Sequence, residues 1–531
     1  MKLRQLQFPL NKGLNVYSPD LTTDELVVRD VKNAVVRLGR YRMANELQEI
    51  QTRPQAGDIM TLAATYDINS LASNVYAFGE VEPLIYRNDS EEFEVIPIPW
   101  YSSRRVPTAS VNWMGKLYAT RPGFPLTRLD GSKFHLVDSA YEVGRPNLSA
   151  RYAIINANHL MVANIRYGAG QYLGRVQWSD IYLPEQWKIL EATEADFFDV
   201  TDDGLEVTGL SNQRGAAVIY TVNGIWRAVY ERLPIIYRFE QIFTGIGNVY
   251  HYAQIQVKDV DFFIGQDNIY ILDGLAAPQP IGTPIWEFFI NDLKDNFRGN
   301  MVIAGQNERF SEVFWTYESK DGSLQQIVFN YLENQWSRRG AQEAYTWLLP
   351  PTQIRTYRTI NSFDTLPDDA ISGGEYSDEP IDGDFQFEVF GETGFAAGRD
   401  GQFFRLRPDR FAQHGSDKQE GFIETFEFSF NSVFREKEHY KTKVLLKKVG
   451  NPTLVLKIGT RKSQSVPVEW TTVPLTDEVG FLGESMFHKR LAGKFIRFRL
   501  EWINGSENDY VEEIYGIGFE IYINDEDKTE K

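Results

Sequence analysis

One short phrase recurs along the chain: a polar turn containing Gly, Asn or Asp, then an apolar residue, then an aromatic one. Clear copies lie at residues 112–118, 223–226, 265–270 and 398–404, each between runs with the character of β-strands. Turns of this composition accommodate positive φ, and the aromatic that follows can pack between sheets. The phrase therefore predicts a chain built largely of β-hairpins.

The copies recur at a nearly constant interval. Tyr118 and Met161, Trp226 and Tyr270, and Tyr270 and Trp315 are each separated by roughly 44 residues, close to the about 40 to 50 residues of a four-stranded propeller blade. We therefore expect an all-β protein in which a β-propeller of about six to eight blades forms most of the chain.

Changes in pattern divide the chain into three parts. Residues 1–60 are expected to be an N-terminal lead-in that contributes to a platform or to the first blade. The propeller is expected over 61–410, with acidic insertions near 167–208 and 350–390. From 411 to 531, alternation of apolar and polar residues predicts an additional antiparallel β-sandwich, the platform domain, that ends in a disordered acidic tail.

Composition restricts the class of protein. The chain has 531 residues with 55 Lys and Arg against 73 Asp and Glu, a formal net charge of −18, which argues against wrapping nucleic acid by general basicity. Cysteine is absent, so disulfides and thiolate metal sites are excluded. No apolar run suits a signal peptide or a membrane span. Helical signals are few, and residues 284–293 predict one short helix.

Common catalytic motifs are missing. The chain has no G-x-x-x-x-G-K-[ST] phosphate loop, no H-E-x-x-H zinc pair and no G-x-S-x-G nucleophile elbow, and its histidines lack ligand spacing. We therefore expect no catalytic residue, no metal and no cofactor. A propeller glycoside hydrolase remains an alternative because carboxylates are abundant, although the sequence does not identify the pair of acids that such an enzyme needs.

A series of longer motifs resembles bacteriophage tail proteins. Trp178-Ser179-Asp180 followed by Pro184 and Trp187 gives the phrase W-S-D … P-x-x-W. Further motifs follow in the order of that family, at residues 218–226, 237–247, 261–274 and 327–337. The chain is similar to the nozzle or hub proteins of short-tailed phages, also called tubular tail protein B or packaged-DNA stabilisation proteins. The usual arginine-rich C-terminal ending of that family is absent.

The resemblance implies a structural virion protein without enzymatic activity. It would be made in the host cytoplasm, assemble as a homohexamer in the virion tail, and form the distal DNA channel that retains the genome and passes it during ejection. The implied partners are the chain itself, the tail adaptor and portal complex, tail fibre or spike proteins, and double-stranded DNA in transient, non-specific passage. Net negative charge is compatible with such a channel, because fixed cations would hold the phosphates.

Two acidic segments are candidates for the lumen or gate of this channel. The candidate residues are Glu191, Glu194, Asp196, Asp199, Asp202, Asp203 and Glu206 in the first segment, and Asp378, Glu379, Asp382 and Asp384 in the second. The interpretation that both segments are outward, solvated loops has equal weight.

A basic stretch over residues 435–462 is the candidate docking face for an acidic neighbour in the ring or the adaptor. Its candidate residues are Arg435, Lys441, Lys443, Lys447, Lys448, Arg461 and Lys462. A plain solvated strand face is the other interpretation. A receptor- or glycan-binding tail protein is a further alternative for the whole chain, since aromatics on propeller loops could hold a sugar.

Overall fold

The computed structural model describes most of the 531 residues of the chain. They are 2–16, 27–43, 46–49, 57–67, 72–80, 82–87, 92–142, 144–200, 206–232, 234–294, 301–340, 344–348, 355–359, 386–390, 394–407, 413–414, 417–418, 420–428, 437–463, 465–473, 482–485, 491–504 and 509–523.

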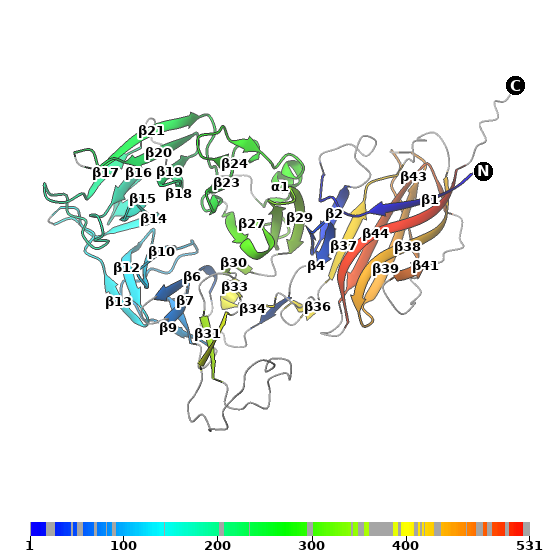
Figure 1. Cartoon of the computed structure of the whole chain (residues 1–531), viewed down its shortest axis with the longest axis horizontal. Coiled ribbons are helices and arrows are strands. Elements are labelled where there is room, and N and C mark those ends of the chain that lie inside the picture. The colour runs from blue at the N-terminus through cyan, green and yellow to red at the C-terminus, as the bar shows by residue number, and fades with distance from the viewer. Residues whose placement is uncertain are drawn as a thin grey trace, which may run out of the picture.

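Seven antiparallel sheets of the described chain stand as blades around a common axis, which confirms the propeller prediction (Figure 1). The first three blades are β6 (Ile59–Asp67), β7 (Ala72–Gly79), β8 (Leu84–Arg87) and β9 (Glu92–Val95); β10 (Ala109–Trp113), β11 (Lys116–Arg121), β12 (Phe124–Asp130) and β13 (Lys133–Leu136); and β14 (Leu148–Asn156), β15 (His159–Tyr167), β16 (Gly170–Trp178) and β17 (Asp196–Asp199).

The next three blades follow the same order of strands. They are β18 (Val207–Gln213), β19 (Ala216–Thr221), β20 (Gly224–Tyr230) and β21 (Tyr237–Thr244); β22 (Ile255–Val257), β23 (Val260–Ile264), β24 (Ile269–Asp273) and β25 (Gln279–Pro280); and β26 (Ile303–Asn307), β27 (Glu312–Glu318), β28 (Leu324–Asn330) and β29 (Gln335–Gly340). The short helix α1 (Trp286–Asp292) lies between the fifth and sixth blades, where the sequence predicts it, and a 3-10 turn, η1 (Glu308–Phe310), links β26 to β27.

The seventh blade closes the ring with strands from both ends of the propeller. Its strands are β30 (Ala344–Leu348), β33 (Gly394–Gly398), β34 (Phe403–Arg407) and β5 (Glu46–Glu49), with the 3-10 turn η4 (Arg399–Gly401) between β33 and β34. Because β5 precedes the first blade in the chain, its pairing with β34 holds the ring closed by backbone hydrogen bonds. The first strands of successive blades contact one another around the ring, and β30 contacts β6.

Two short pairs extend this blade. β31 (Arg355–Thr359) and β32 (Gln386–Phe390) form a separate ribbon between β30 and β33, which projects from the propeller in Figure 1. β35 (Gln413–His414) and β36 (Asp417–Lys418) continue the sheet beyond β5.

The sandwich combines the C-terminal strands with strands of the lead-in. One sheet contains β2 (Val28–Lys32), β37 (Glu420–Thr425), β43 (Phe495–Ile503), β39 (Thr453–Arg461) and β40 (Glu469–Val473). The other contains β44 (Tyr510–Ile523), β38 (Lys437–Val449) and β41 (Leu482–Ser485), with β1 (Lys2–Pro9) paired to β44 and β42 (Leu491–Gly493) paired to β38. The predicted sandwich is therefore present, and β1 and β2 of the lead-in belong to it.

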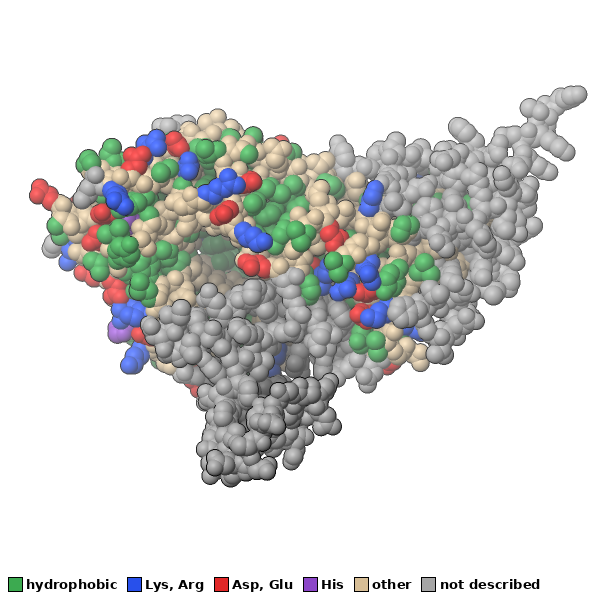
Figure 2. All heavy atoms as spheres, in the orientation of Figure 1, with side chains coloured by type: hydrophobic (Ala, Val, Ile, Leu, Met, Phe, Trp, Pro, Cys, Tyr) green, Lys and Arg blue, Asp and Glu red, His purple; other side chains and the backbone are tan. Residues whose placement is uncertain are grey.

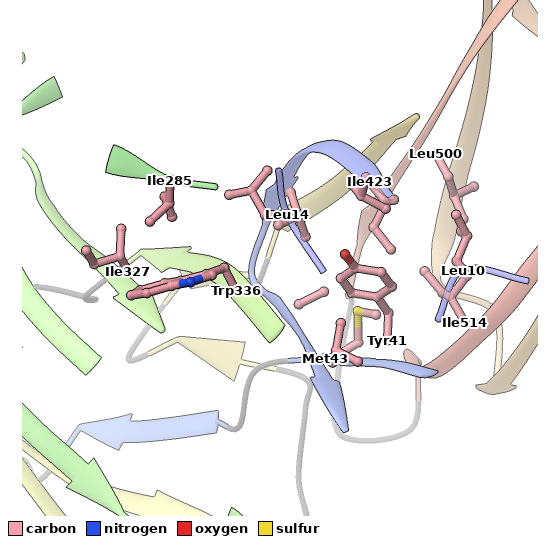
Figure 3. Packing of buried hydrophobic residues seen from close by; sticks show 14 of the residues in the cluster. Leu10, Leu14, Tyr41, Met43, Ile285, Ile327, Trp336, Ile423, Leu500 and Ile514 are labelled. Carbon is pink, nitrogen blue, oxygen red and sulfur yellow. The ribbon is translucent and has the colours of Figure 1, made fainter. Parts of the chain in front are cut away.

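One continuous sheet joins the propeller to the sandwich. β29 of the sixth blade pairs with β3 (Ala34–Arg37), β3 pairs with β4 (Arg40–Met43), and β4 pairs with β44. A single hydrophobic core follows this junction, and Figure 3 shows Trp336 on the propeller side and Tyr41 on the sandwich side of it. Beneath it, the buried carboxylate of Glu312 accepts a hydrogen bond from Arg37 at 2.6 Å and lies 3.6 Å from Arg339. The two parts are therefore packed as one body.

The recurring phrase forms a hairpin at all four predicted places, but the turns differ. Positive φ occurs at Met114 and Gly115 in the first copy and at Asp400 and Gly401 in the last. Residues 223–226 and 265–270 turn without it. Gly265 has a different role, because a Cβ atom there would lie 2.7 Å from the ring of Tyr270.

Candidate functional site

The motif W-S-D … P-x-x-W builds the long connection between β16 and β17, residues 179–195. The carboxylate of Asp180 accepts hydrogen bonds from the backbone N–H groups of Ile181 at 2.9 Å and Glu194 at 2.8 Å. Trp178 donates from its indole to the carbonyl of Glu194 at 2.8 Å. Trp187 is fully buried against the second and third blades and donates to the carbonyl of Pro184 at 2.9 Å. The motif residues therefore fix the shape of a connection, and their polar groups are used for that purpose.

This pinned connection presents large apolar side chains to solvent. Tyr182, Leu183 and Leu190 are 59%, 54% and 54% exposed, and Ile189 is partly exposed. Ile235, on the β20–β21 connection of the next blade, is 56% exposed. We call these five residues the apolar rim. Exposed apolar residues that gather on one part of a surface often mark protein contact sites, so we treat the apolar rim as a candidate contact surface.

A buried polar cluster supports the apolar rim from below. His159, at the start of β15, places Nε2 3.2 Å from the carboxylate of Glu194, and Tyr230 donates to the same carboxylate at 2.9 Å. Burial lowers the pKa of His159, with Glu194 opposing this effect. The hydroxyl of Tyr237 lies 3.2 Å from Nδ1 of the same imidazole and donates to the carbonyl of Asn156 at 3.0 Å. The cluster ties the connection to the third and fourth blades.

Those predicted acidic channel residues that the structure describes do not gather into one group. Asp199 lies at the end of β17, and its carboxylate accepts hydrogen bonds from Nε and a terminal nitrogen of Arg175 at 2.7 and 2.8 Å. Glu194 contacts His159, the first residue of β15. Glu206 accepts a hydrogen bond at 3.3 Å from Asn164, further along the same strand. Five residues of strand separate these two contacts, about 16 Å. The structure therefore places Glu194 and Glu206 toward opposite faces of the propeller.

The remaining acidic candidates are either exposed or outside the described residues. Glu191 is exposed in the connection before β17, and Asp196 is exposed as the first residue of β17. Six of them lie outside the described residues: Asp202, Asp203, Asp378, Glu379, Asp382 and Asp384. The assignment of these carboxylates to a lumen or gate stays a prediction. On the face of the propeller seen in Figure 2, acidic and basic side chains are interspersed.

Several predicted docking cations are already paired within the chain. Lys447 lies 2.6 Å from the carboxylate of Glu512, and Arg461 is hydrogen-bonded to Glu427. Lys448 is half-buried and Lys462 is exposed. Lys441 and Lys443 are residues of β38, and Arg435 lies outside the described residues. Docking by this stretch stays a prediction.

An ion-pair ladder crosses the outer face of the β2–β37–β43–β39–β40 sheet. Arg497 donates to Glu424 and to Glu427, both at 2.9 Å. Arg499 donates to Glu424 at 3.0 Å and to Glu501 at 2.8 Å. Each of these arginines bridges two carboxylates, so the centre of this face is close to electrical balance. A neighbour would gain little from attraction to its cations, because those charges already have partners.

A shallow groove lies on the same sheet. It has a volume of about 280 Å³, and Phe422, Val455, Arg499, Glu501 and Trp502 are among the residues that line it. The guanidinium of Arg499 stacks 3.7 Å from the centre of the Phe422 ring. This volume is just below the roughly 300 to 1,000 Å³ of small-molecule sites, and both charged groups are engaged with each other. The groove is therefore a weaker candidate for ligand binding.

Among the described residues, no group of three or more His, Asp or Glu side chains is placed to hold a metal ion. Within the same residues, none of the helices has the length and apolar character needed to cross a bilayer.

No protein-family model matches the chain, and no curated protein matches it significantly. Similar solved structures include the WD40 domain of Neurospora crassa Pan2, at 9% identity and a TM-score of 0.34, covering 68% of this chain and 92% of that one. The extracellular domain of a putative hybrid two-component system from B. thetaiotaomicron is similar at 10% identity and a TM-score of 0.42, covering 82% and 54%. A glycoside hydrolase family 43 arabinoxylan arabinofuranohydrolase from Bacillus subtilis is similar at 9% identity and a TM-score of 0.24, covering 96% and 99%. Likenesses at this level carry no conclusion about activity.

Proposed function

We propose that the protein is a structural subunit of the tail of a short-tailed phage, a nozzle or hub that assembles as a homohexamer around the DNA exit channel. The observation that carries the proposal is the apolar rim on a connection whose shape is fixed by the W-S-D … P-x-x-W motif. That motif is also one part of the resemblance to tail proteins, which rests on the order of several motifs. A ring needs a rigid subunit and a surface that meets a different surface of its neighbour.

The junction between propeller and sandwich supports the requirement for rigidity. A sheet that runs from β29 through β3 and β4 to β44 resists relative motion of the two parts, because bending it would break backbone hydrogen bonds. A subunit of this kind transmits load across a ring as one body. The apolar rim then supplies the contact that requires a partner.

The pairing of Lys447 with Glu512 and of Arg461 with Glu427 favours the apolar rim over the basic stretch as the principal subunit contact. Leu183→Asp combined with Leu190→Asp is expected to abolish hexamers while leaving the subunit folded, because both side chains are mostly exposed in the monomer. Leu332→Asp is the matched control, since Leu332 is 77% exposed on the sixth blade, away from the apolar rim. Lys447→Glu with Lys448→Glu tests the alternative contact and is expected to weaken assembly less.

The test is oligomer mass followed by cryo-electron microscopy of the purified chain and of tails from the phage that encodes it. A sixfold ring around a channel wide enough for duplex DNA, lost in the Leu183 and Leu190 double variant and kept in the control, supports the proposal. A chain that is monomeric alone and absent from the tail density would overturn it.

A further inference from the structure

Three arginine side chains from separate segments converge on one side of the propeller. Arg166 on β15 lies directly across from Ser149 on β14, and Arg151 stands two residues further along β14 on the same face as Ser149. Side chains in such a diagonal arrangement are within reach of one another. The register alone therefore brings two guanidinium groups together on this face of the third blade.

The third arginine arrives from the connection between the first and second blades. The hydroxyl of Ser149 accepts a hydrogen bond from the backbone N–H of Gly123 at 3.3 Å, which places the β11–β12 turn over the same face. The guanidinium of Arg104 packs against Gly123, where a Cβ atom would lie 3.1 Å from its Nε. Gly123 has φ of +86°, a conformation that favours glycine. Because glycine has no Cβ atom, the guanidinium of Arg104 can occupy this space.

A tyrosine completes the group from the link between the fourth and fifth blades. The ring of Tyr252 has its centre 6.0 Å from the guanidinium carbon of Arg151. The hydroxyl of Tyr152 on β14 shares a hydrogen bond of 2.6 Å with Nδ1 of His251, the residue before Tyr252. This bond holds the link beside β14. We call Arg104, Arg151, Arg166 and Tyr252 the arginine cluster.

The polar groups of the arginine cluster lack partners. In the described chain, none of its three arginine side chains makes a hydrogen bond or an ion pair. The Nε atoms of Arg151 and Arg166 and the hydroxyl oxygen of Tyr252 are shielded from solvent and have no hydrogen-bond partner. Such donors have lost their hydrogen bonds to water without gaining a partner in the protein, which is unfavourable until a ligand accepts them. Arg104 is exposed, so the cluster remains open to solutes.

Neighbouring charged groups do not neutralise the cluster. Arg121 is buried beside it, but its guanidinium is used by the carbonyls of Gly79 at 2.8 Å and Arg104 at 2.9 Å. The acidic neighbour is Glu206, whose carboxylate lies 3.2 Å from Nε2 of His251. Carbonyl groups do not cancel the charge of Arg121, so with it four guanidinium charges stand against the one carboxylate of Glu206, and the local charge is positive.

The ionisation of these groups agrees with a crowded set of cations. Burial, and then the like charges of Arg151 and Arg104, lower the pKa of Arg166. Burial raises the pKa of Tyr252 to about 12, so its hydroxyl keeps its proton at neutral pH and can donate a hydrogen bond. Every member of the cluster is therefore a donor.

We propose that the arginine cluster is a binding site for a phosphate group. Guanidinium forks match the oxygens of phosphate in geometry, and the tyrosine hydroxyl supplies a further donor. The local excess of positive charge favours a phosphate dianion over a single carboxylate. This site is separate from the apolar rim, so it goes beyond the proposed subunit contact.

Thermal unfolding of the full chain in inorganic phosphate at about pH 8 tests the site, with sodium chloride at matched ionic strength and sodium acetate as comparisons. Phosphate is expected to raise the melting temperature of the native chain, and acetate to raise it less. Arg166→Gln and Tyr252→Phe are expected to weaken phosphate binding roughly tenfold or more, because each removes a donor to a charged group. Arg238→Gln is the control, since Arg238 is exposed and paired with Glu231 at 2.5 Å on the fourth blade.

If Arg166 had only a structural role, its replacement should lower the melting temperature of the chain without phosphate. The proposed site predicts the opposite. Arg166→Gln removes mutual repulsion, so without phosphate this variant should melt at or above the temperature of the native chain, and with phosphate it should gain less. A short single-stranded oligonucleotide distinguishes the source of the phosphate: binding that the same variants weaken identifies a nucleic-acid phosphate, and binding of inorganic phosphate alone identifies a free phosphate. Absence of any phosphate-specific shift in the native chain, or an equal shift in Arg166→Gln, overturns the proposal.

Discussion

Asp261 makes the folding of this propeller depend on pH in a direction that can be worked out from its surroundings. The side chain lies on β23, fully buried between the fourth and fifth blades. Its carboxylate accepts hydrogen bonds from Ser211 at 2.5 Å, Tyr220 at 2.6 Å and Gln254 at 3.3 Å. The described chain places no cation against it. Removal from water therefore dominates its ionisation.

Burial raises the pKa of Asp261 from 3.8 to about 6, although the three hydrogen bonds act in the opposite direction. The folded chain consequently holds this proton more tightly than the unfolded chain does. The stabilisation is complete below about pH 4 and is lost as the pH rises through about 6. A difference of about two pH units corresponds to about 3 kcal/mol.

The substitution Asp261→Asn removes the ionisation while keeping a similar shape. Urea unfolding of both chains between about pH 4 and pH 7 should show the variant becoming more stable relative to the native chain by about 3 kcal/mol over that range. Asp259→Asn, at an exposed position in the turn before β23, should show no such trend. A stability difference between Asp261→Asn and the native chain that stays constant with pH would refute the reasoning, because it would mean that the carboxyl titrates alike in both states.

Two further substitutions test the packing that positions the candidate surfaces. Trp187→Ala should destabilise the chain by about 3–5 kcal/mol in urea unfolding, because the indole is fully buried beneath the apolar rim, whereas Leu183→Ala should change stability by less than about 0.5 kcal/mol. Glu312→Ala should cost about 3–5 kcal/mol in the same assay, since it leaves the guanidinium groups of Arg37 and Arg339 buried without that carboxylate. A loss below about 1 kcal/mol in either buried variant would contradict the described packing.

The fold could be predicted from the sequence where equivalent strands carry similar residues. Tyr118 and Met161 both lie on second strands of their blades, and Trp226 and Tyr270 both lie on third strands. Trp315 lies on a second strand, so its interval from Tyr270 spans different parts of two blades. The phrase therefore identified the architecture without giving the number of blades.

The closure of the ring could not be read from local pattern. β5 completes the seventh blade from residues 46–49, more than 350 positions before its partner β34. Four residues carry too little periodicity to be recognised as a strand, and their partner is determined by the geometry of the closed ring. The same limit applies to β3, which joins the two parts of the molecule through one register pair, Arg338 with Ala34.

The candidate sites were harder to predict, because the partners of charged residues are remote in the sequence. The acidic run that includes Asp199 has the appearance of a solvated loop, yet Arg175 lies directly across from Asp199 in the β16–β17 ladder. Arg104, Arg151 and Arg166 are scattered among other residue types and form no local motif. The β14–β15 register brings Arg151 and Arg166 together, and the packing of neighbouring blades adds Arg104, so no basic run in the sequence marks the three residues.

The paired cations of the sandwich and the unpaired arginine cluster would affect the proposed passage of DNA in different ways. Several of the cations on the sandwich are already paired with carboxylates, so they offer little hold to phosphates that move past. The arginine cluster differs, because its donors are unpaired and its excess charge is positive. If it lies on the DNA path it must retain DNA until ejection, and oligonucleotide binding should then weaken as salt is raised. If it binds free phosphate alone, retention of the genome cannot depend on it, and Arg166→Gln tails should hold DNA as firmly as native tails.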